Sequence, residues 1–310
     1  MTFPLGHRVA WREHEGHVLV GVENFDAIDC ETCRFAHVIP VPSEQALTAY
    51  YRTSFYEESK PDYFDVAERD RQWKNIGFDS KLQMLESAID SAKTRRILDI
   101  GSGPGHFLLR AKERGWTAVG VEASPAAAEC SRRLNIEVYE GYFNGREGLN
   151  LGYFNAIHMQ HVLEHVPDPA DLLRRLTELL LPGGAICLEV PNDFSIVQEV
   201  LHTEMNFPAW WVAPPEHLNF FSRDSLTLLL RSSGYEPVEW TSQFPIDLAL
   251  IAGVDYVNDP AVGSSIHDFR KALEVNLTKY GPHGLVKEMY KALLDVGLGR
   301  QLVVVARRKA

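Results

Sequence analysis

Apolar and polar positions alternate with two different periods along this chain, and the change of period divides it into segments. Residues 17–22 (HVLVGV) are mostly apolar and strand-like, which predicts a small β unit that closes at Pro40 and Pro42. Residues 43–94 are polar and aromatic, and the periodicity of 46–51 and 80–92 predicts helices. From residue 95 to about 245, short apolar runs alternate with helical patterns, which predicts a parallel sheet.

Turn and cap residues place the elements of this central region. Residues 154–158 form the fourth predicted strand, and a helix over 170–181 is followed by Pro182-Gly183-Gly184 and a strand over 185–190. A helix over 222–233 and a strand over 236–241 come next, then a helical stretch and an apolar run at 301–306. The predicted domains are a small β unit over 1–42, a helical lead-in over 43–94, an α/β domain over 95–245, a helical insertion over 246–297 and a final strand within 298–310.

The most informative segment is residues 95–124 (RRILDIGSGPGHFLLRAKERGWTAVGVEAS). An apolar run ends in a turn containing Gly101, Gly103 and Gly105, and an amphipathic segment and a second apolar run follow, ending in Glu122. In such a strand–loop–helix–strand unit, glycines let the backbone approach a ligand at the helix N-terminus, and the acidic residue can bind ribose hydroxyls. The segment predicts a nucleoside-binding site.

The glycine spacing separates two classes of cofactor. Dinucleotide binding favours G-x-G-x-x-G, which presents bare amides to a pyrophosphate. Here the spacing is Gly101-x-Gly103-x-Gly105, and His106 occupies the place of the third glycine. Asp99 would repel a pyrophosphate, whereas a carboxylate there suits a ligand with an ammonium group.

Composition narrows the class of protein further. The 310 residues carry a net charge of −11 and contain no long basic run, which argues against a nucleic-acid substrate. The four cysteines are not spaced as a disulfide framework. No segment approaches the roughly 20 apolar residues of a membrane span, and the N-terminus lacks a signal-peptide pattern. These properties predict a cytoplasmic enzyme with no membrane or nucleic-acid partner, and they leave its oligomeric state open.

Three motifs carry a family resemblance: the strand ending in D-x-G-x-G-x-G at 99–105, HVLEHVPDP at 161–169 and LLLPGG at 179–184. On these motifs the chain resembles the class I S-adenosylmethionine (SAM) methyltransferases, in the branch that includes ubiquinone-biosynthesis methyltransferases and many sugar and natural-product enzymes. The resemblance implies an α/β fold with a Rossmann-like, doubly wound, seven-stranded sheet and an antiparallel last strand. The small N-terminal β unit and a helical cap formed by 43–94 and 246–297 would be additions to it.

The resemblance also implies which residues bind SAM. The residues expected around its methionine part are Asp99, Gly101, Gly103 and Gly105. Glu122 would bind the ribose, with Ala123 and Ser124 beside the adenosine. Tyr142 and Phe143 would flank the adenine, and Gln160 and His161 would close the site near the sulfonium.

The acceptor side is expected in the aromatic, proline-rich loop 206–221, which leaves the carboxyl end of a predicted strand. Family members often have an E-H-x-x-x-F stretch there, lining the acceptor pocket. His217 is the first candidate for a general base, because imidazole titrates near neutral pH; His161 and His165 are rivals, and holding the loop or aligning the reactants is the alternative role. The implied activity is methylation of a small polar acceptor, most simply O-methylation of a sugar or related metabolite. C- or N-methylation, NAD-dependent oxidation and SAM binding without turnover remain open.

Two metal hypotheses arise from histidine spacing. His161-x-x-Glu164-His165 matches the short inverted zinc-protease motif, but it lies where the methyltransferase pattern expects it. At the N-terminus, the spacing predicts structural zinc on His14, His17, Cys30 and Cys33. Some sugar methyltransferases carry an N-terminal zinc-binding, ribbon-like segment with two C-x-x-C pairs, whose second half this region resembles. The histidines stand where its first cysteine pair is expected, so they replace that pair or the site has been lost.

Overall fold

The computed structural model describes residues 3–54, 63–90, 95–143 and 151–309, without the side chains of 51–54 and 63. The chain forms two compact units, each built from separate segments. Unit 1 comprises residues 1–41, 190–229 and 240–303, and unit 2 comprises residues 42–189, 230–239 and 304–310. Within the described residues, no helix is both long enough and apolar enough to cross a membrane.

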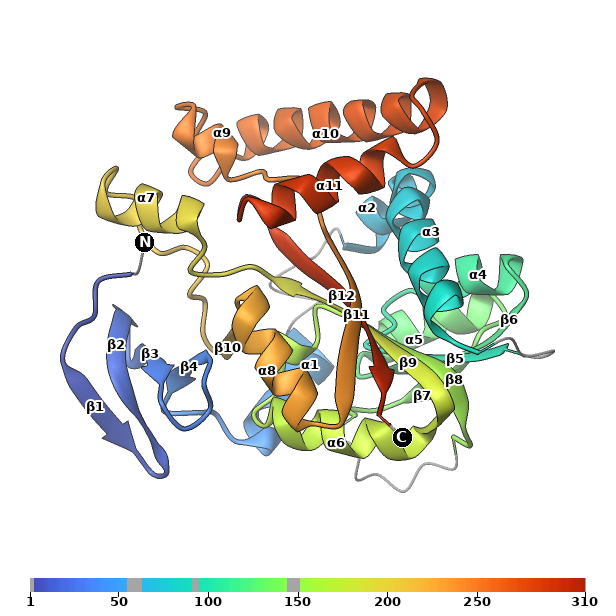
Figure 1. The fold of residues 1–310 in the computed structure, drawn as a ribbon, viewed down its shortest axis with the longest axis horizontal. Helices are drawn as coiled ribbons and strands as arrows, with labels where there is room; N and C mark the ends of the chain where they lie inside the picture. The colour runs from blue at the N-terminus through green and yellow to red at the C-terminus, as the bar shows by residue number, and fades with distance from the viewer. Residues whose placement is uncertain (1–2, 55–62, 91–94, 144–150, 310) are drawn as a thin grey trace. The chain divides into compact units, whose positions relative to one another are not determined.

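The main sheet has seven strands in the order β11-β12-β9-β8-β5-β6-β7 (Figure 1). Its central pairings, β9 with β8, β8 with β5, β5 with β6 and β6 with β7, are parallel, and the closing strands are antiparallel. This is the predicted Rossmann-like α/β fold, which is thereby confirmed. The strands are β5 (Arg95–Ile100), β6 (Trp116–Glu122), β7 (Glu137–Glu140), β8 (Phe154–Gln160), β9 (Leu180–Pro191), β11 (Tyr235–Ser242) and β12 (Gln301–Arg308).

Local sequence explains where several helices of unit 2 begin. Ser124 caps α5 (Pro125–Arg133) by accepting a hydrogen bond from the Ala127 amide, and Asp168 caps α6 (Pro169–Leu179) through the Asp171 amide. Proline follows each cap, where its missing N–H costs the helix nothing. The other described helices that begin in unit 2 are α1 (Glu44–Ser54), α2 (Tyr63–Arg69), α3 (Arg71–Ala88), α4 (His106–Glu113) and the 3₁₀ turn η2 (Leu163–His165).

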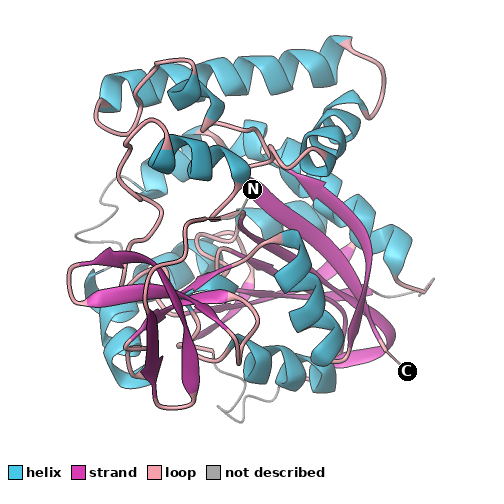
Figure 2. Cartoon of the chain, turned by 60° about the vertical axis from the view of Figure 1, so that its left-hand side comes forward, coloured by secondary structure: helices cyan, strands magenta, loops and turns pink. Residues whose placement is uncertain are grey.

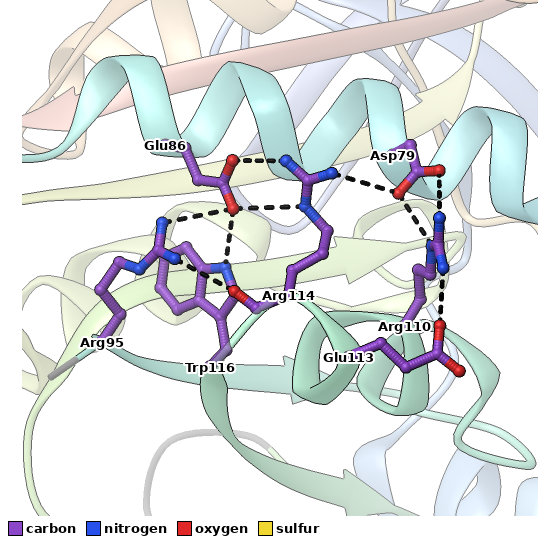
Figure 3. Close-up of polar contacts among 7 residues, drawn as sticks. All are labelled: Asp79, Glu86, Arg95, Arg110, Glu113, Arg114 and Trp116. Atoms are coloured by element: carbon purple, nitrogen blue, oxygen red, sulfur yellow. Dashed lines mark hydrogen bonds and ion pairs between the residues drawn. The ribbon is translucent and has the colours of Figure 1, made fainter.

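Helix α3 is tied to α4 and to the neighbouring strands by an ion-pair network (Figure 3). Arg110 donates two hydrogen bonds to Asp79, at 2.9 and 2.7 Å. One turn further along, Arg114 donates to Glu86, which also accepts a hydrogen bond from the Trp116 indole at 3.2 Å. Because Asp79 and Glu86 lie two helical turns apart, the network fixes α3 at two points along its length. Arg95 and Glu113 complete it.

The boundary between α6 and β9 differs from its prediction. The helix ends at Leu179, and Leu180 already has extended backbone angles, so Pro182-Gly183-Gly184 lies inside β9 rather than ending the helix. The residue before a proline is disfavoured in helical conformation, which accounts for the earlier end. The predicted helix over 80–92 is α3, which begins nine residues earlier, and residues 91–92 lie outside the described ranges.

Unit 1 contains a small antiparallel sheet in the order β1-β2-β3-β4-β10 (Figure 2). Its strands are β1 (Arg8–Trp11), β2 (His14–Val22), β3 (Phe25–Cys30), β4 (Ala36–Ile39) and β10 (Asn219–Phe220). The first four strands confirm the predicted N-terminal β unit. The fifth strand, only two residues long, comes from the end of loop 206–221 and pairs with β4, which the sequence did not predict.

Residues 246–297 are largely helical, as predicted. Helix α10 packs beside α11 (Figure 1). A capping box between Ser195 and Gln198 stabilises the N-terminus of α7. The helices with residues in unit 1 are α7 (Ile196–Thr203), α8 (Arg223–Ser232), α9 (Leu248–Ile251), α10 (Pro260–Tyr280) and α11 (Leu285–Asp295). The role of residues 43–94 and 246–297 as a cap, and the five-segment division of the chain, stay predictions.

Candidate functional site

The glycine turn follows β5 and leads directly into α4. Gly101, Gly103 and Gly105 have φ values of +69°, +54° and +83°, a region that side chains other than glycine rarely adopt. At Gly105 a Cβ atom would lie 2.6 Å from the hydroxyl of Ser131, which itself donates to the Gly103 carbonyl. The turn therefore requires glycine for both backbone conformation and space.

Glu122 ends the neighbouring strand and is tied to the glycine turn. Its Oε2 accepts a hydrogen bond from the Gly103 amide at 2.7 Å, and its Oε1 accepts one from the Ser124 amide at 2.8 Å. Burial raises the pKa of Glu122 above its ordinary value, and these amides partly oppose the shift. Each carboxylate oxygen has a further lone pair. The orientation of Glu122 is thus fixed while acceptor capacity remains for a ligand hydroxyl.

A pocket opens between the glycine turn and the carboxyl ends of β6, β7 and β8. Its walls are mostly apolar, with the carboxylate of Glu122, two histidines and the phenol of Tyr142 as polar groups, a composition that suits a nucleoside. The predicted cofactor residues that line it are Gly101, Glu122, Ala123, Tyr142, Phe143 and His161, together with Ile100, Val121, Gly141, Val162, His165 and Val166. The predicted residues that do not line it are Asp99, Gly103, Gly105, Ser124 and Gln160.

Asp99 is buried beside His158, which lies opposite it on β8. The two side chains are 2.7 Å apart, and because a carboxylate only accepts, His158 Nδ1 donates. His158 also stacks on Phe107 of α4, with 3.7 Å between ring centroids. Burial lowers the pKa of His158, and the charge of Asp99 opposes this without cancelling it. The pattern of β8 gave no sign that His158 would be the partner of Asp99.

Lys81 of α3 is a further buried charged residue near the ends of β8 and β9, and the sequence did not indicate it. Its Nζ donates to Gln160 Oε1 at 2.6 Å and to Glu189 Oε2 at 2.8 Å, at the carboxyl ends of β8 and β9. The side chains of Lys81 and Glu189 are only 4% and 1% exposed, so this is a buried ion pair. Burial alone would raise the pKa of Glu189, but the charges of Lys81 and His161 hold it below its ordinary value.

His161 lies close to two carboxylates, those of Glu164 and Glu189. Its Nδ1 is 3.0 Å from Glu164 Oε1, and its Nε2 is 3.6 Å from Glu189 Oε1. Burial favours a lower pKa, but the imidazole is 39% exposed and the two carboxylates outweigh burial, so the pKa of His161 is raised. His165 follows on the 3₁₀ turn η2. Because this turn is a single short element, His161 and His165 are not one α-helical turn apart, which the zinc-protease interpretation requires.

His217 belongs to unit 1, in loop 206–221. Its amide donates to the Ala213 carbonyl at 3.0 Å, so the residue sits in a turn just before β10. Earlier in the loop, Trp211 is buried in an aromatic cluster with Phe194 and Trp210. The packing of Trp211 on Phe194 anchors the loop within unit 1, whereas the hydrogen bond of His217 is internal to the loop. The role of His217 as a base is a proposal.

Three of the four predicted metal ligands lie together in unit 1. His14 Nδ1 is 3.8 Å from Cys30 Sγ and 3.3 Å from Cys33 Sγ. The fourth member of this group is His37, whereas His17 Nδ1 instead donates to the Gly6 carbonyl at 2.9 Å. The sequence contained His37, but no short spacing motif connected it to the other three residues.

Comparison with known proteins agrees with this geometry. The model of the methyltransferase-domain family matches residues 67–239, more than half of the chain. A ubiquinone biosynthesis O-methyltransferase of Dinoroseobacter shibae is 30% identical over 156 residues, covering 47% of this chain and 62% of the relative. A trans-aconitate 2-methyltransferase of Mycobacterium tuberculosis is 30% identical over 113 residues, covering 36% and 42%. The chain thus spans less than two thirds of the length of these relatives.

Solved structures support the fold. Magnesium protoporphyrin IX methyltransferase from Synechocystis PCC 6803, with bound SAH, has a TM-score of 0.52 at 9% identity, covering 86% of this chain and 100% of that one. A SAM-dependent methyltransferase from Archaeoglobus fulgidus has a TM-score of 0.50 at 20% identity, covering 79% and 99%. From the family match, the sheet order and the glycine turn together, the chain belongs to the methyltransferase-domain family and has the fold of the class I SAM-dependent methyltransferases.

Proposed function

We propose that the protein transfers the methyl group of SAM to an oxygen of a small polar acceptor, most simply a sugar or related metabolite. The observation that carries the cofactor half of this proposal is Glu122, held by the Gly103 and Ser124 amides at the edge of an apolar pocket. The acceptor half is supported by the names of two relatives, a ubiquinone biosynthesis O-methyltransferase and a trans-aconitate 2-methyltransferase.

The residues present fit SAM. Glu122 would accept from the ribose hydroxyls, and the aromatic pair Tyr142 and Phe143 would flank the adenine. Asp99 Oδ1 accepts a hydrogen bond from His158, and the residue does not line the pocket, so we expect it to favour the ammonium end of SAM through its negative charge. When bound, SAM supplies the electrophilic methyl group; the chain's own residues bind, orient and exclude water.

Loop 206–221 supplies the proposed acceptor residues. Loop 206–221 follows β9 and α7, and its His217 would take the proton of an acceptor hydroxyl as the oxygen attacks. C- or N-methylation of a similar acceptor is the alternative. A cytoplasmic location and the absence of nucleic-acid partners remain predictions from composition.

Replacement of Glu122 by Ala should weaken SAM binding by about 1–3 kcal/mol, because it leaves ribose hydroxyls without their acceptor. Isothermal calorimetry with SAM, SAH and NADH measures this directly. Glu122→Gln keeps the size of the side chain and should lose less. Glu140→Ala, which removes an exposed carboxylate from the end of the adjacent strand β7, should leave SAM affinity unchanged.

The same titrations, together with an assay of S-adenosylhomocysteine release, separate the competing functions. Binding of NADH by the wild-type protein, with no heat from SAM, would show an oxidoreductase. SAM binding without release of S-adenosylhomocysteine across a panel of phenols, sugars and hydroxy acids would favour a binding protein without turnover. A structural zinc ion is a separate proposal, because its predicted ligands lie in unit 1 and their evidence is independent of methyl transfer.

A further inference from the structure

The small sheet of unit 1 brings four nitrogen and sulfur donors to one place. His14 begins β2, Cys30 ends β3, and the register pairs Gly16 of β2 with Cys30. After Cys30 the chain turns sharply: Arg34 has a φ of +63° and its amide donates to the Cys30 carbonyl. The turn carries Cys33 back toward Cys30, so that the Cys33 amide donates to Cys30 Sγ at 3.4 Å. This is a knuckle that presents both sulfurs to the same side.

The distances between the donor atoms match a tetrahedral metal site. Around zinc, bonds of about 2.3 Å to sulfur and 2.0 Å to nitrogen place a sulfur and a nitrogen about 3.6 Å apart. The two separations from His14 Nδ1, 3.8 Å to Cys30 and 3.3 Å to Cys33, bracket that value. The donor atoms of His14, Cys30, Cys33 and His37 all lie within 4.8 Å of one another.

His37 supplies an independent observation. The residue is 3% exposed, and its Nδ1 is 3.0 Å from the Val38 carbonyl, which can only accept. The proton is therefore on Nδ1, and Nε2 carries a lone pair. That Nε2 atom is buried and has no hydrogen-bond partner among the described residues. A ring nitrogen held by a backbone carbonyl, with the opposite nitrogen bare, is the arrangement of a metal-binding histidine.

We propose that His14, Cys30, Cys33 and His37 bind one structural zinc ion. Two thiolates and two imidazoles in tetrahedral arrangement suit zinc, and four protein ligands leave no open position for a substrate or an activated water. The site is structural for this reason.

The ligand set replaces His17 by His37, and strand geometry explains the change. Successive side chains of a strand point to opposite faces, so residues three apart, such as His14 and His17, face opposite sides of β2. His37 reaches the site from β4. The two-residue strand β10 pairs with β4, and its Asn219 lies opposite His37. The ion would therefore also fix the strand that holds the end of loop 206–221.

Metal analysis of single variants tests the ligand set. The full chain, produced with zinc in the medium and without a histidine tag, should contain about one zinc per chain. His17→Ala should retain that stoichiometry, whereas His37→Ala and Cys33→Ser should lose most of it. His37→Cys, which restores a zinc ligand at the same position, should recover bound zinc. Cobalt substitution of the wild type should give thiolate charge-transfer absorption.

Three results would overturn the proposal. The first is wild-type protein with less than about a tenth of an equivalent of zinc and with Cys30 and Cys33 both reactive toward a thiol reagent in the native state. The second is a Cys30–Cys33 disulfide in place of bound metal. The third is loss of zinc from His17→Ala, which would restore the ligand set given by spacing. The His17 variant decides the fourth ligand even if His37→Ala does not fold.

Discussion

Replacing Lys81 with Met should lower the free energy of unfolding by about 3–5 kcal/mol, because it leaves Glu189 charged and buried without its partner. The two side chains are 4% and 1% exposed and their charged atoms are 2.8 Å apart, so solvent cannot substitute for the lost ammonium group. Helix α3 cannot readily move to compensate, since the network through Asp79 and Glu86 holds it (Figure 3). Urea unfolding at neutral pH measures the loss.

The pH dependence of that loss identifies its cause. In the wild type, the pKa of Glu189 is lowered on folding, so its contribution is present above the pKa of the unfolded state and is lost as the pH falls through the folded value. Without Lys81, His161 is the remaining positive neighbour of Glu189, and we expect burial to outweigh its charge and raise this pKa. The deficit of Lys81→Met should therefore shrink as the pH approaches about 4.3, the ordinary pKa of a glutamate, because protonation of Glu189 removes the uncompensated charge.

Two variants control this interpretation. Lys112→Met removes an exposed lysine whose ammonium donates to a backbone carbonyl, and it should cost less than about 1 kcal/mol. The double variant Lys81→Met/Glu189→Gln should recover part of the loss, since the buried charge is gone. If Lys81→Met cost no more than Lys112→Met, the pair would behave as a solvated surface contact. If the double variant were as unstable as the sum of its single changes, the two residues would act independently.

Replacing His217 with Ala should lower turnover by about 10²–10⁴ while leaving SAM affinity nearly unchanged, if His217 removes the acceptor proton. Turnover is followed as S-adenosylhomocysteine release with the best acceptor from the panel described above. His283→Ala removes an exposed histidine between α10 and α11 and should have no effect. Near-normal turnover of the His217 variant would exclude it as the base and move the assignment to His161.

The rival histidine has its own signature in the pH profile. A base must be unprotonated, and Glu164 and Glu189 raise the pKa of His161. If His161 is the base, the turnover of the enzyme should therefore fall as the pH drops through a value above about 6.5, the ordinary pKa of histidine. Glu164→Gln would then shift that fall to lower pH. The profile should not move if His217 is the base. Loss of less than about tenfold in every histidine variant would indicate that the enzyme works mainly by aligning the reactants.

The sequence by itself determined the fold class and brought most of the proposed cofactor residues into one segment, because both depend on neighbouring residues. The strand, the glycine turn and α4 are contiguous, and Glu122 comes at the end of the very next strand, so one short segment contains the information. Helix starts at Ser124 and Asp168 were likewise local, since a cap acts on amides three residues away.

Only the tertiary structure decided the buried pair of Lys81 with Glu189 and the grouping of His37 with His14, Cys30 and Cys33. Lys81 and Glu189 are 108 residues apart in the chain, and a lysine in an amphipathic helix gives no sign that it will be buried against a sheet. His37 and not His17 joins His14 because strand pleat and register, rather than spacing along the chain, decide which side chains meet. The pairing of β10 with β4 is of the same kind, since a two-residue strand has no period to read and forms only where a partner edge is already in place.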